Sequence, residues 1–333
     1  MSNTVTHFLP DGAPRLDRFL ADSYPDIARS RWDAWVRSGQ VRVNGEVVLK
    51  AGTRIRAGAT VETELPELVP PALHLQPELI DLPTLFEDSH LWIVDKPAGM
   101  VVHPGPGHPS GTVLNALLGR LHVPVLEAPL LPGEPVEDDE ELIPAPLWPG
   151  LVHRLDRYTT GCLAMAKDVG AQQALQVQFK ERTVEKRYLA LVRMSRKLPE
   201  VGSVLVDQPI ARHRVDRLKM AVNASGRPSQ TRVKLVAKAC GLALVECELL
   251  TGRTHQIRLH LAHLGAPILG DPLYGGAPSW LDADKRTFPC LHPMLHAWKL
   301  SINHPGDGRR LDFVAPLPEA YRAVLGKLGI DIP

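Results

Sequence analysis

Long apolar runs and paired cysteines are missing from this 333-residue chain. No stretch approaches the roughly 18 uninterrupted apolar residues that a membrane-spanning helix needs. The N-terminus also lacks the basic start and apolar run of a secretory signal. The four cysteines are widely spaced and form no C-x-x-C pair, which argues against a disulfide framework or a zinc site. We therefore expect a globular cytoplasmic protein without a bound metal.

Strong net charge is missing as well, because the whole chain carries only +1. The charge is unevenly distributed. Residues 124–149 contain seven acidic residues and no lysine or arginine, and removing them leaves +8 on the remainder. Residues 29–56 hold seven basic side chains against two acidic ones, and residues 209–234 hold seven against one. These two stretches fit contacts with a phosphate backbone and ordinary solvated surface equally well.

The N-terminal part of the sequence predicts a small module of two helices and a curled hairpin. The apolar spacing indicates one helix over residues 16–20 and a second over 30–37. Asn44 and Gly45 stand between two strand-like pieces and form the strongest short hairpin signal in the chain. The predicted boundaries are a loose leader over 1–12, the module over 13–65 and a proline-rich linker over 66–78.

Residues 79–333 predict one larger domain. Its expected helices cover residues 170–181 and 253–264. Its expected strands are LWIVDKP, CLAMAK, KRYLALVRM, TRVKLVA and LALVECELL. Strands at hairpin spacing with interspersed helices, and without βαβ alternation, predict an α+β fold around a mixed, largely antiparallel sheet. The acidic, proline-rich residues 124–149 read as a surface insertion to which we assign no regular structure.

Asp156 lies in the most unusual segment, LVHRLDRYTTG, which also contains His153, Arg154 and Arg157. Nearby cations lower the pKa of a carboxyl group. An ionised carboxylate suits a nucleophile better than a general acid. An isolated Arg-x-Asp is, however, more often a structural ion pair or a turn cap.

The segment KRYLALV offers a second group of polar residues. If it forms a strand, Lys186 and Tyr188 share one face and Arg187 points to the other. A tyrosine opposite a carboxylate can stack on a flat heterocycle or relay a proton. A lone tyrosine more often simply packs against its neighbours.

The third segment, LLTGRTHQIRLHLAHLG, places Arg253 at the start of the predicted helix, where backbone N–H groups favour anions. His260 and His263 form H-x-x-H, but that helix has no acidic residue to complete a metal site. Packing or phosphate contact is therefore the favoured role of both histidines. The glycine-rich loop at 96–111 fits neither a Walker loop nor a dinucleotide fingerprint. It leaves a nucleotide-dependent transferase or hydrolase as an alternative that ATP binding would favour.

Five segments in one order carry a family resemblance: KPAGMVVHPG, VHRLDRYTTG, KRYLALV, ELLTGRTHQIRLHLAHLG and ILGDPLYGG. With the tail LHPMLHAWKLSINHP and FVAPLP, they resemble the RluA-type pseudouridine synthases. Residues 14–64 resemble the small RNA-binding module first known from ribosomal small-subunit protein four. The resemblance covers most of the chain and leaves out the leader, the linker and the acidic insertion.

The resemblance implies a role for several side chains. Asp156 matches the catalytic aspartate, and Tyr188 matches the tyrosine that stacks on the target base and joins in proton transfer. Arg253 matches the arginine that pairs with the catalytic carboxylate. The implied substrate-binding residues are Arg154, which fills the gap that the uridine leaves in the RNA, Lys186, which supports the site electrostatically, and His153.

The function that the resemblance implies is isomerisation of uridine to pseudouridine in structured RNA. It implies the pseudouridine synthase fold, an RNA partner and no cofactor, and we take a monomer as the default. Large-subunit ribosomal RNA is the expected substrate. The alternatives are a tRNA-directed enzyme and a catalytically silent RNA-binding or ribosome-assembly protein. Two departures from the family pattern are Tyr158-Thr159-Thr160-Gly161 for Asp-Thr-Ser-Gly, and Trp148-Pro149-Gly150 for Arg-Pro-Gly.

Overall fold

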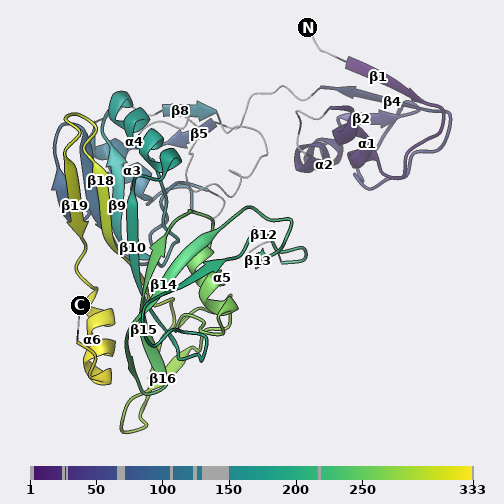
Figure 1. Cartoon of the computed structure of the whole chain (residues 1–333). Coiled ribbons are helices and arrows are strands. Elements are labelled where there is room, and N and C mark those ends of the chain that lie inside the picture. Colours follow the sequence, from purple (N-terminus) through teal and green to yellow (C-terminus); the bar gives the residue numbers. More distant parts are fainter. Residues whose placement is uncertain are drawn as a thin grey trace. The chain divides into compact units, whose positions relative to one another are not determined.

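The chain divides into two compact units in the computed structural model (Figure 1). One unit is Met1–His74 with Glu127–Glu137, and the other is Leu75–Leu126 with Asp138–Pro333. The structure describes residues 4–24, 27, 29–65, 72–105, 108–122, 126–129, 150–216 and 219–331. No helix in these described ranges is long and apolar enough to cross a membrane.

The smaller unit is a four-stranded antiparallel sheet with two helices. The sheet order is β1-β4-β2-β3, with β1 (Thr4–Leu9), β2 (Val41–Val43), β3 (Glu46–Val47) and β4 (Ala59–Glu64). The helices are α1 (Leu16–Ser23) and α2 (Arg29–Arg37). Leu16, Leu20 and Trp32 are fully buried in a common core with the sheet residues Val41 and Val61. Burial of these apolar side chains therefore holds the helix layer against the sheet layer.

Two features of the smaller unit bear on the sequence expectations. The Asn44-Gly45 turn joins β2 to β3, and both residues have positive φ, as a two-residue hairpin turn requires. The N-terminal residues differ from the expected loose leader, because Thr4–Leu9 forms β1 and pairs along its whole length with β4. The partner strand lies about fifty residues away in sequence, so local patterning did not reveal it.

The larger unit is built on a nine-stranded sheet. Its order is β11-β14-β15-β10-β18-β9-β7-β6, and β19 pairs with β18. The strands are β6 (Thr84–Glu87), β7 (Leu91–Lys96), β9 (Thr160–Ala166), β10 (Glu185–Arg193), β11 (Val204–Asp207), β14 (Gln230–Ala239), β15 (Leu242–Leu249), β18 (Leu295–Asn303) and β19 (Arg310–Val314). The pairings are antiparallel except for the parallel pair β9 and β18. The predicted α+β fold with a mixed, largely antiparallel sheet is confirmed.

Gly161 is required where β9 meets β18. Its φ is +109°, and a Cβ atom there would lie 2.2 Å from the carbonyl oxygen of Ala297. Only glycine reaches this conformation without strain. Thr160 and Gly161 already belong to β9, and Gly161 lets this strand approach β18 closely.

Four helices pack on this sheet or beside it: α3 (Val113–Arg120), α4 (Val169–Glu181), α5 (Gln256–His263) and α6 (Glu319–Leu328) (Figure 1). Leu175 and Phe179 of α4 lie in a core cluster with residues of β7, β9 and β18. Tyr321 and Leu325 of α6 lie in a second cluster with residues of β10 and β15. The α4 helix begins one residue before the predicted position, whereas α5 begins three residues after it.

The remaining strands form three two-stranded sheets: β5 (Ala72–Leu75) with β8 (Leu126–Pro129), β12 (Ile210–Arg212) with β13 (Met220–Val222), and β16 (Ser279–Leu281) with β17 (Thr287–Pro289). All four residues of β5 fall in the segment expected to be a linker. Most of the predicted acidic insertion, residues 130–149, lies outside the described residues, as do residues 66–71 of the predicted linker.

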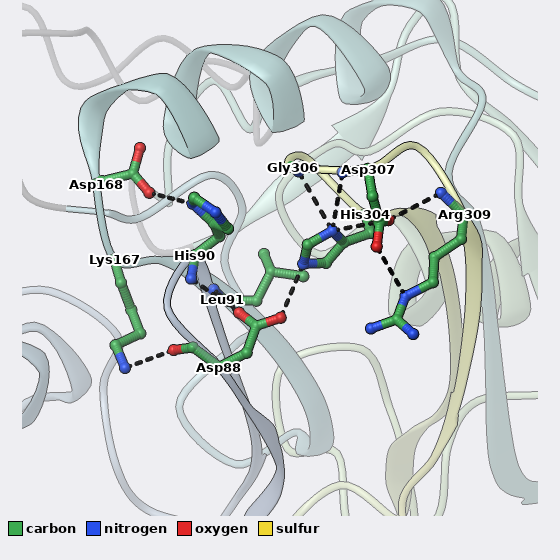
Figure 2. Close-up of polar contacts among 9 residues, drawn as sticks. All are labelled: Asp88, His90, Leu91, Lys167, Asp168, His304, Gly306, Asp307 and Arg309. Carbon is green, nitrogen blue, oxygen red and sulfur yellow. Dashed lines mark hydrogen bonds and ion pairs between the residues drawn. The ribbon is translucent and has the colours of Figure 1, made fainter.

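A polar cluster joins three loops at one end of the larger sheet (Figure 2). Asp88, in the turn between β6 and β7, accepts hydrogen bonds from the backbone N–H groups of His90 and Leu91 at 2.8 Å. Its other carboxylate oxygen lies 2.8 Å from Nε2 of His304, in the turn between β18 and β19. Nδ1 of His90 lies 2.8 Å from the carboxylate of Asp168, the N-cap of α4. The cluster holds these turns together away from the residues singled out for chemistry.

The Asp88→Asn variant is expected to unfold more easily at neutral pH. Burial alone would raise the pKa of Asp88. The hydrogen bonds from His90, Leu91 and His304 lower it by a larger amount, so the pKa lies below its ordinary value. The charge therefore stabilises the fold above the ordinary pKa, and this stabilisation is lost as the pH falls through the lowered value. We expect the free energy of unfolding to drop by about 1–3 kcal/mol at pH 7.

Urea unfolding at several pH values measures this difference. The gap between the unaltered protein and Asp88→Asn should close toward pH 3. The matched control is Asp284→Asn, whose side chain is 68% exposed and should change little. A gap that stays constant down to acid pH would contradict the role given to the Asp88 charge.

Candidate active site

The carboxylate of Asp156 lies in the loop that leads into β9, and it is only 17% exposed. Nη1 of Arg258 donates a hydrogen bond to its Oδ2 atom at 3.0 Å. The backbone N–H of Thr159 donates to the carbonyl of Asp156 at 3.1 Å, which closes a turn around the residue. The carboxylate is thus held in place yet remains partly accessible.

Arg258 bridges two carboxylates. Its Nε and Nη2 atoms donate to the two oxygens of Asp271 at 2.7 and 2.9 Å, and Asp271 is fully buried. Two parallel bonds of this kind fix both the position and the plane of the guanidinium. The remaining nitrogen, Nη1, is therefore aimed at Asp156 by a partner in the GDPLYGG segment.

The hydrogen bond to Asp156 comes from Arg258, to which the sequence gave no role, and the pairing of Arg253 with the carboxylate stays a prediction. The sequence assigned the carboxylate pairing to Arg253 at the start of a helix. The α5 helix instead begins at Gln256, after His255 has taken the left-handed conformation with φ +57°. Arg258 then lies in the first turn of α5 and reaches Asp156, while Arg253 precedes the helix and lines the same small cavity.

His255 is the second side chain of α5's start that faces the carboxylate, with its Nε2 atom 3.9 Å from Oδ2 of Asp156. Its Nδ1 atom lies 2.9 Å from the hydroxyl of Tyr274, which also accepts a hydrogen bond from the backbone N–H of Met220. Burial raises the pKa of Tyr274 to about 12, so the phenol keeps its proton and is able to donate a hydrogen bond to Nδ1 in the tautomer that carries hydrogen on Nε2. The Nε2–H group is then the one that faces Asp156.

The surroundings of Asp156 favour its ionised form. Burial alone would raise the pKa of the carboxyl group, but His255, Arg258 and Arg154 together hold it below its ordinary value. Burial lowers the pKa of His255, which Asp156 only partly offsets, so the imidazole is mainly neutral at pH 7. Arg258 keeps its charge at pH 7, and it is therefore the main cause of the lowered pKa of Asp156 at that pH.

Asp156 lies where two cavities meet. The smaller, about 30 Å³, is also lined by Tyr188, Arg253 and Leu249. The larger, about 600 Å³, extends past Tyr158 and His292. The residues that line both are Arg154, Leu155, Asp156, Thr159, His255 and Arg258. A ligand in the larger cavity therefore has access to the carboxylate.

Lys96 ties a second loop to the back of the Asp156 loop. Its ammonium group is fully buried and donates to the carbonyl oxygens of Pro97, Met100 and Arg157 at 2.8–3.0 Å. Burial lowers the pKa of Lys96 to about 7, against the pull of Asp156 and of a second carboxylate that favour the charged form. The backbone N–H of Gly99 also donates to the carbonyl of Arg157 at 2.9 Å. These bonds fix the residue that directly follows Asp156.

Four of the six site residues expected from the sequence share the smaller cavity: Asp156, Tyr188, Arg253 and Arg154. Lys186 and His153 are not among the described residues that line either cavity. The ammonium of Lys186 lies 5.4 Å from the ring centre of Phe179 in α4. The His153 ring stacks on the same phenyl group at 4.8 Å and accepts a hydrogen bond from the backbone N–H of Ala164. Burial, with Lys186 nearby, lowers the pKa of His153 to about 3.

The H-x-x-H pair of α5 has a structural explanation. His260 is fully buried, with Nδ1 2.8 Å from the hydroxyl of Thr231 and Nε2 3.0 Å from the carbonyl of Gln208. Both ring nitrogens are thus used in hydrogen bonds, and burial lowers the pKa of the imidazole to about 4. His263 is exposed. Within the described residues, no group of three or more His, Cys, Asp or Glu side chains could hold a metal ion.

The assembled site contains an ionised carboxylate, a buried aromatic ring and several cations, a set suited to covalent attack on a planar substrate that carries negative charge. Sequence reasoning missed Arg258, His255, Asp271 and Lys96. For the first three, the available signal was their place in the same motifs, GRTHQIR and GDPLYGG. Lys96 stands in KPAGMVVHPG, a segment that carries the family resemblance but to which the sequence gave no site residue.

Comparisons with known proteins agree with this set of motifs. A sequence profile described as RNA pseudouridylate synthase matches residues 90–263, and a profile of the S4 domain matches residues 14–61. The chain is 39% identical to a Xanthomonas campestris protein named ribosomal large subunit pseudouridine synthase D, over 97% of this chain and 92% of that protein. A Nitrosomonas europaea protein of the same name is 40% identical, over 97% and 87%. The solved structure of human RNA pseudouridylate synthase domain containing 4 matches with a TM-score of 0.54 and 27% identity, over 75% and 94%.

Proposed function

This chain belongs to the RNA pseudouridylate synthase family, and we propose that it isomerises a uridine of large-subunit ribosomal RNA with Asp156 as the nucleophile. The observation that carries the proposal is the environment of Asp156. Its carboxylate is accessible from two joined cavities, is held by Arg258 and lies in the same small cavity as Tyr188.

The reaction needs the target uridine outside the RNA stack. Extruding a base costs about a few kcal/mol. Arg154, which lines both cavities, offsets that cost by filling the gap in the RNA, and Tyr188 offsets it by stacking on the base. These two roles explain why an arginine and a tyrosine flank the carboxylate.

Asp156 then attacks either carbon 6 of the uracil or the anomeric carbon of the ribose, and both routes remain open. In either route the bond between N1 and the ribose breaks, the base turns, and a bond from carbon 5 to the ribose replaces it. The proton released from carbon 5 is balanced by the one gained at N1. The reaction is an isomerisation, so it needs no oxidant and no added group.

The substrate proposal rests on the relatives and on the small unit. The Xanthomonas and Nitrosomonas proteins carry names that refer to the large ribosomal subunit. The S4 domain at residues 14–61 supports a structured RNA partner. A tRNA-directed enzyme is the second candidate. A silent RNA-binding protein is disfavoured by the presence of both Asp156 and Tyr188, and cytoplasmic location stays a prediction.

Mapping of pseudouridines in cellular RNA, with and without the intact gene, tests this function. We expect one or more sites in large-subunit ribosomal RNA to disappear when the gene is removed and to return when it is restored. Restoration with a gene that encodes Asp156→Asn should leave those sites unmodified. Sites lost only from tRNA would favour the second candidate, and an unchanged map of both RNAs would contradict the proposal.

A further inference from the structure

An aromatic pair stands in the wall of the larger cavity. The rings of Tyr158 and His292 lie 3.9 Å apart and are nearly parallel, with an angle of 9° between them. The guanidinium carbon of Arg157 lies 5.1 Å from the centre of the Tyr158 ring. Tyr158 precedes β9 and His292 lies between β17 and β18, so the stack joins two distant segments of the chain.

The cavity has room and charge for more than the reacting base. Its volume of about 600 Å³ is within the usual range for small-molecule sites, about 300–1,000 Å³. Asp156 is the one carboxylate among its described lining residues, which include the cations Arg154, Arg157 and Arg258. Such walls attract the phosphate backbone of RNA. A nucleoside at Asp156 would leave part of this cavity, whose walls include Tyr158 and His292, available for a neighbouring nucleotide.

The stacked rings present a flat surface in the cavity wall. Tyr158 is half-buried, with one face covered by His292 and with Arg157 over the ring. His292 is exposed, and its neighbour Leu291 is 73% exposed. Unpaired bases of RNA bind on exposed aromatic rings by stacking, and the contact tolerates any base because every base has a flat face.

We propose that His292, held flat by Tyr158, is a stacking platform for an unpaired nucleobase next to the target uridine. This inference rests on the proposed function, because it takes the target uridine to be at Asp156. The platform selects RNAs in which the neighbour of the target is also unpaired. It adds a second base contact to the flipped uridine and fixes the direction in which the strand leaves the site.

A binding cycle with two variants and paired RNAs tests the platform. The probes are fluorescein-labelled synthetic RNA hairpins that carry the uridine identified by mapping, either intact or with one abasic nucleotide on its 5′ or 3′ side. Anisotropy gives the Kd of each hairpin for the full-length protein. We expect His292→Ala to weaken binding of the intact hairpin about tenfold. The same substitution should have little effect on one of the two abasic hairpins, and His292→Phe should bind the intact hairpin as the unaltered protein does.

The control is His263→Ala, which removes an exposed histidine of α5 that does not line the cavity and should leave all the Kd values unchanged. An equal loss from His292→Ala on intact and abasic hairpins would overturn the platform, as would no loss at all. Isomerisation of the intact hairpin is measured in parallel. If the unaltered protein isomerises the hairpin but the effect of His292→Ala on Kd is independent of the neighbouring base, only the platform is contradicted. If the unaltered protein isomerises none of the hairpins, both the proposed function and the platform are contradicted.

Discussion

The Asp156→Asn enzyme is expected to isomerise uridine more than about 10⁴-fold more slowly than the unaltered enzyme. The amide has nearly the shape of the carboxylate and can still accept the hydrogen bond from Arg258, but it is neutral and does not attack carbon. Single-turnover formation of pseudouridine in a ribosomal RNA fragment measures the rate. Binding of the same fragment should persist, because Asp156 contributes no positive charge to the RNA interface.

Two measurements show whether lost activity in Asp156→Asn comes from the missing carboxylate or from unfolding. Asp284→Asn makes the same chemical change at an exposed position in the loop between β16 and β17 and should keep full activity. The thermal transition of Asp156→Asn should show a folded protein. Substantial activity in a folded Asp156→Asn enzyme would remove this residue from the role of nucleophile.

Replacing Arg258 by methionine is expected to affect both stability and chemistry. The change leaves the buried carboxylate of Asp271 without its bidentate partner and removes the hydrogen bond from Arg258 to Asp156. Breaking a buried ion pair from one side typically lowers the free energy of unfolding by about 3–5 kcal/mol. The rate at pH 7 should fall by about 10²-fold, because the carboxylate loses the bond that orients it.

The pH profile separates this positioning role from simple loss of stability. The pKa of Asp156 is lowered in the folded enzyme, and the anion is the reactive form, so activity is lost only as the pH falls through that lowered value. Without the guanidinium the acid limb should move upward by about 1–3 pH units. Arg258→Lys keeps the positive charge and should fold well enough for the same profile, with a smaller upward shift.

Arg253→Met distinguishes the two arginines of the GRTHQIR motif. It is expected to weaken RNA binding or turnover without moving the acid limb, because Arg258 remains against the carboxylate. If Arg253→Met moves the acid limb and Arg258→Met does not, the assignment made from the geometry is wrong and the one implied by the sequence resemblance is right.

Features with a local cause could be predicted from the sequence. The Asn44-Gly45 hairpin was foreseen because its turn requires positive φ at both positions, and the structure has it. The buried strands β7, β9, β10 and β15 were foreseen because each is a short apolar run that ends in a polar or turn residue. Asp156 and Tyr188 were chosen from two separate motifs, and the fold brings both to one cavity.

Features with a distant cause could not be predicted. The first strand, β1, depends on its pairing with β4. Its own residues, TVTHFL, give no local signal that identifies this partner. The contact between Arg258 and Asp156 depends on where α5 begins, which is three residues later than expected and follows the left-handed turn at His255. The contacts of the His153 ring with the next strand and with α4 also join distant parts of the sequence, and its role in substrate binding stays a prediction.

The three carbonyl oxygens around Lys96 use all three hydrogens of its ammonium group. Burial lowers the pKa of Lys96 to about 7, but the three acceptors favour the charged form. A side chain enclosed in this way does not contact RNA phosphates and should contribute little to the salt dependence of the complex. Its charge acts inside the protein, where it anchors the peptide bond next to the attacking group. The Lys96 side chain therefore links two backbone segments through hydrogen bonds to their carbonyl groups.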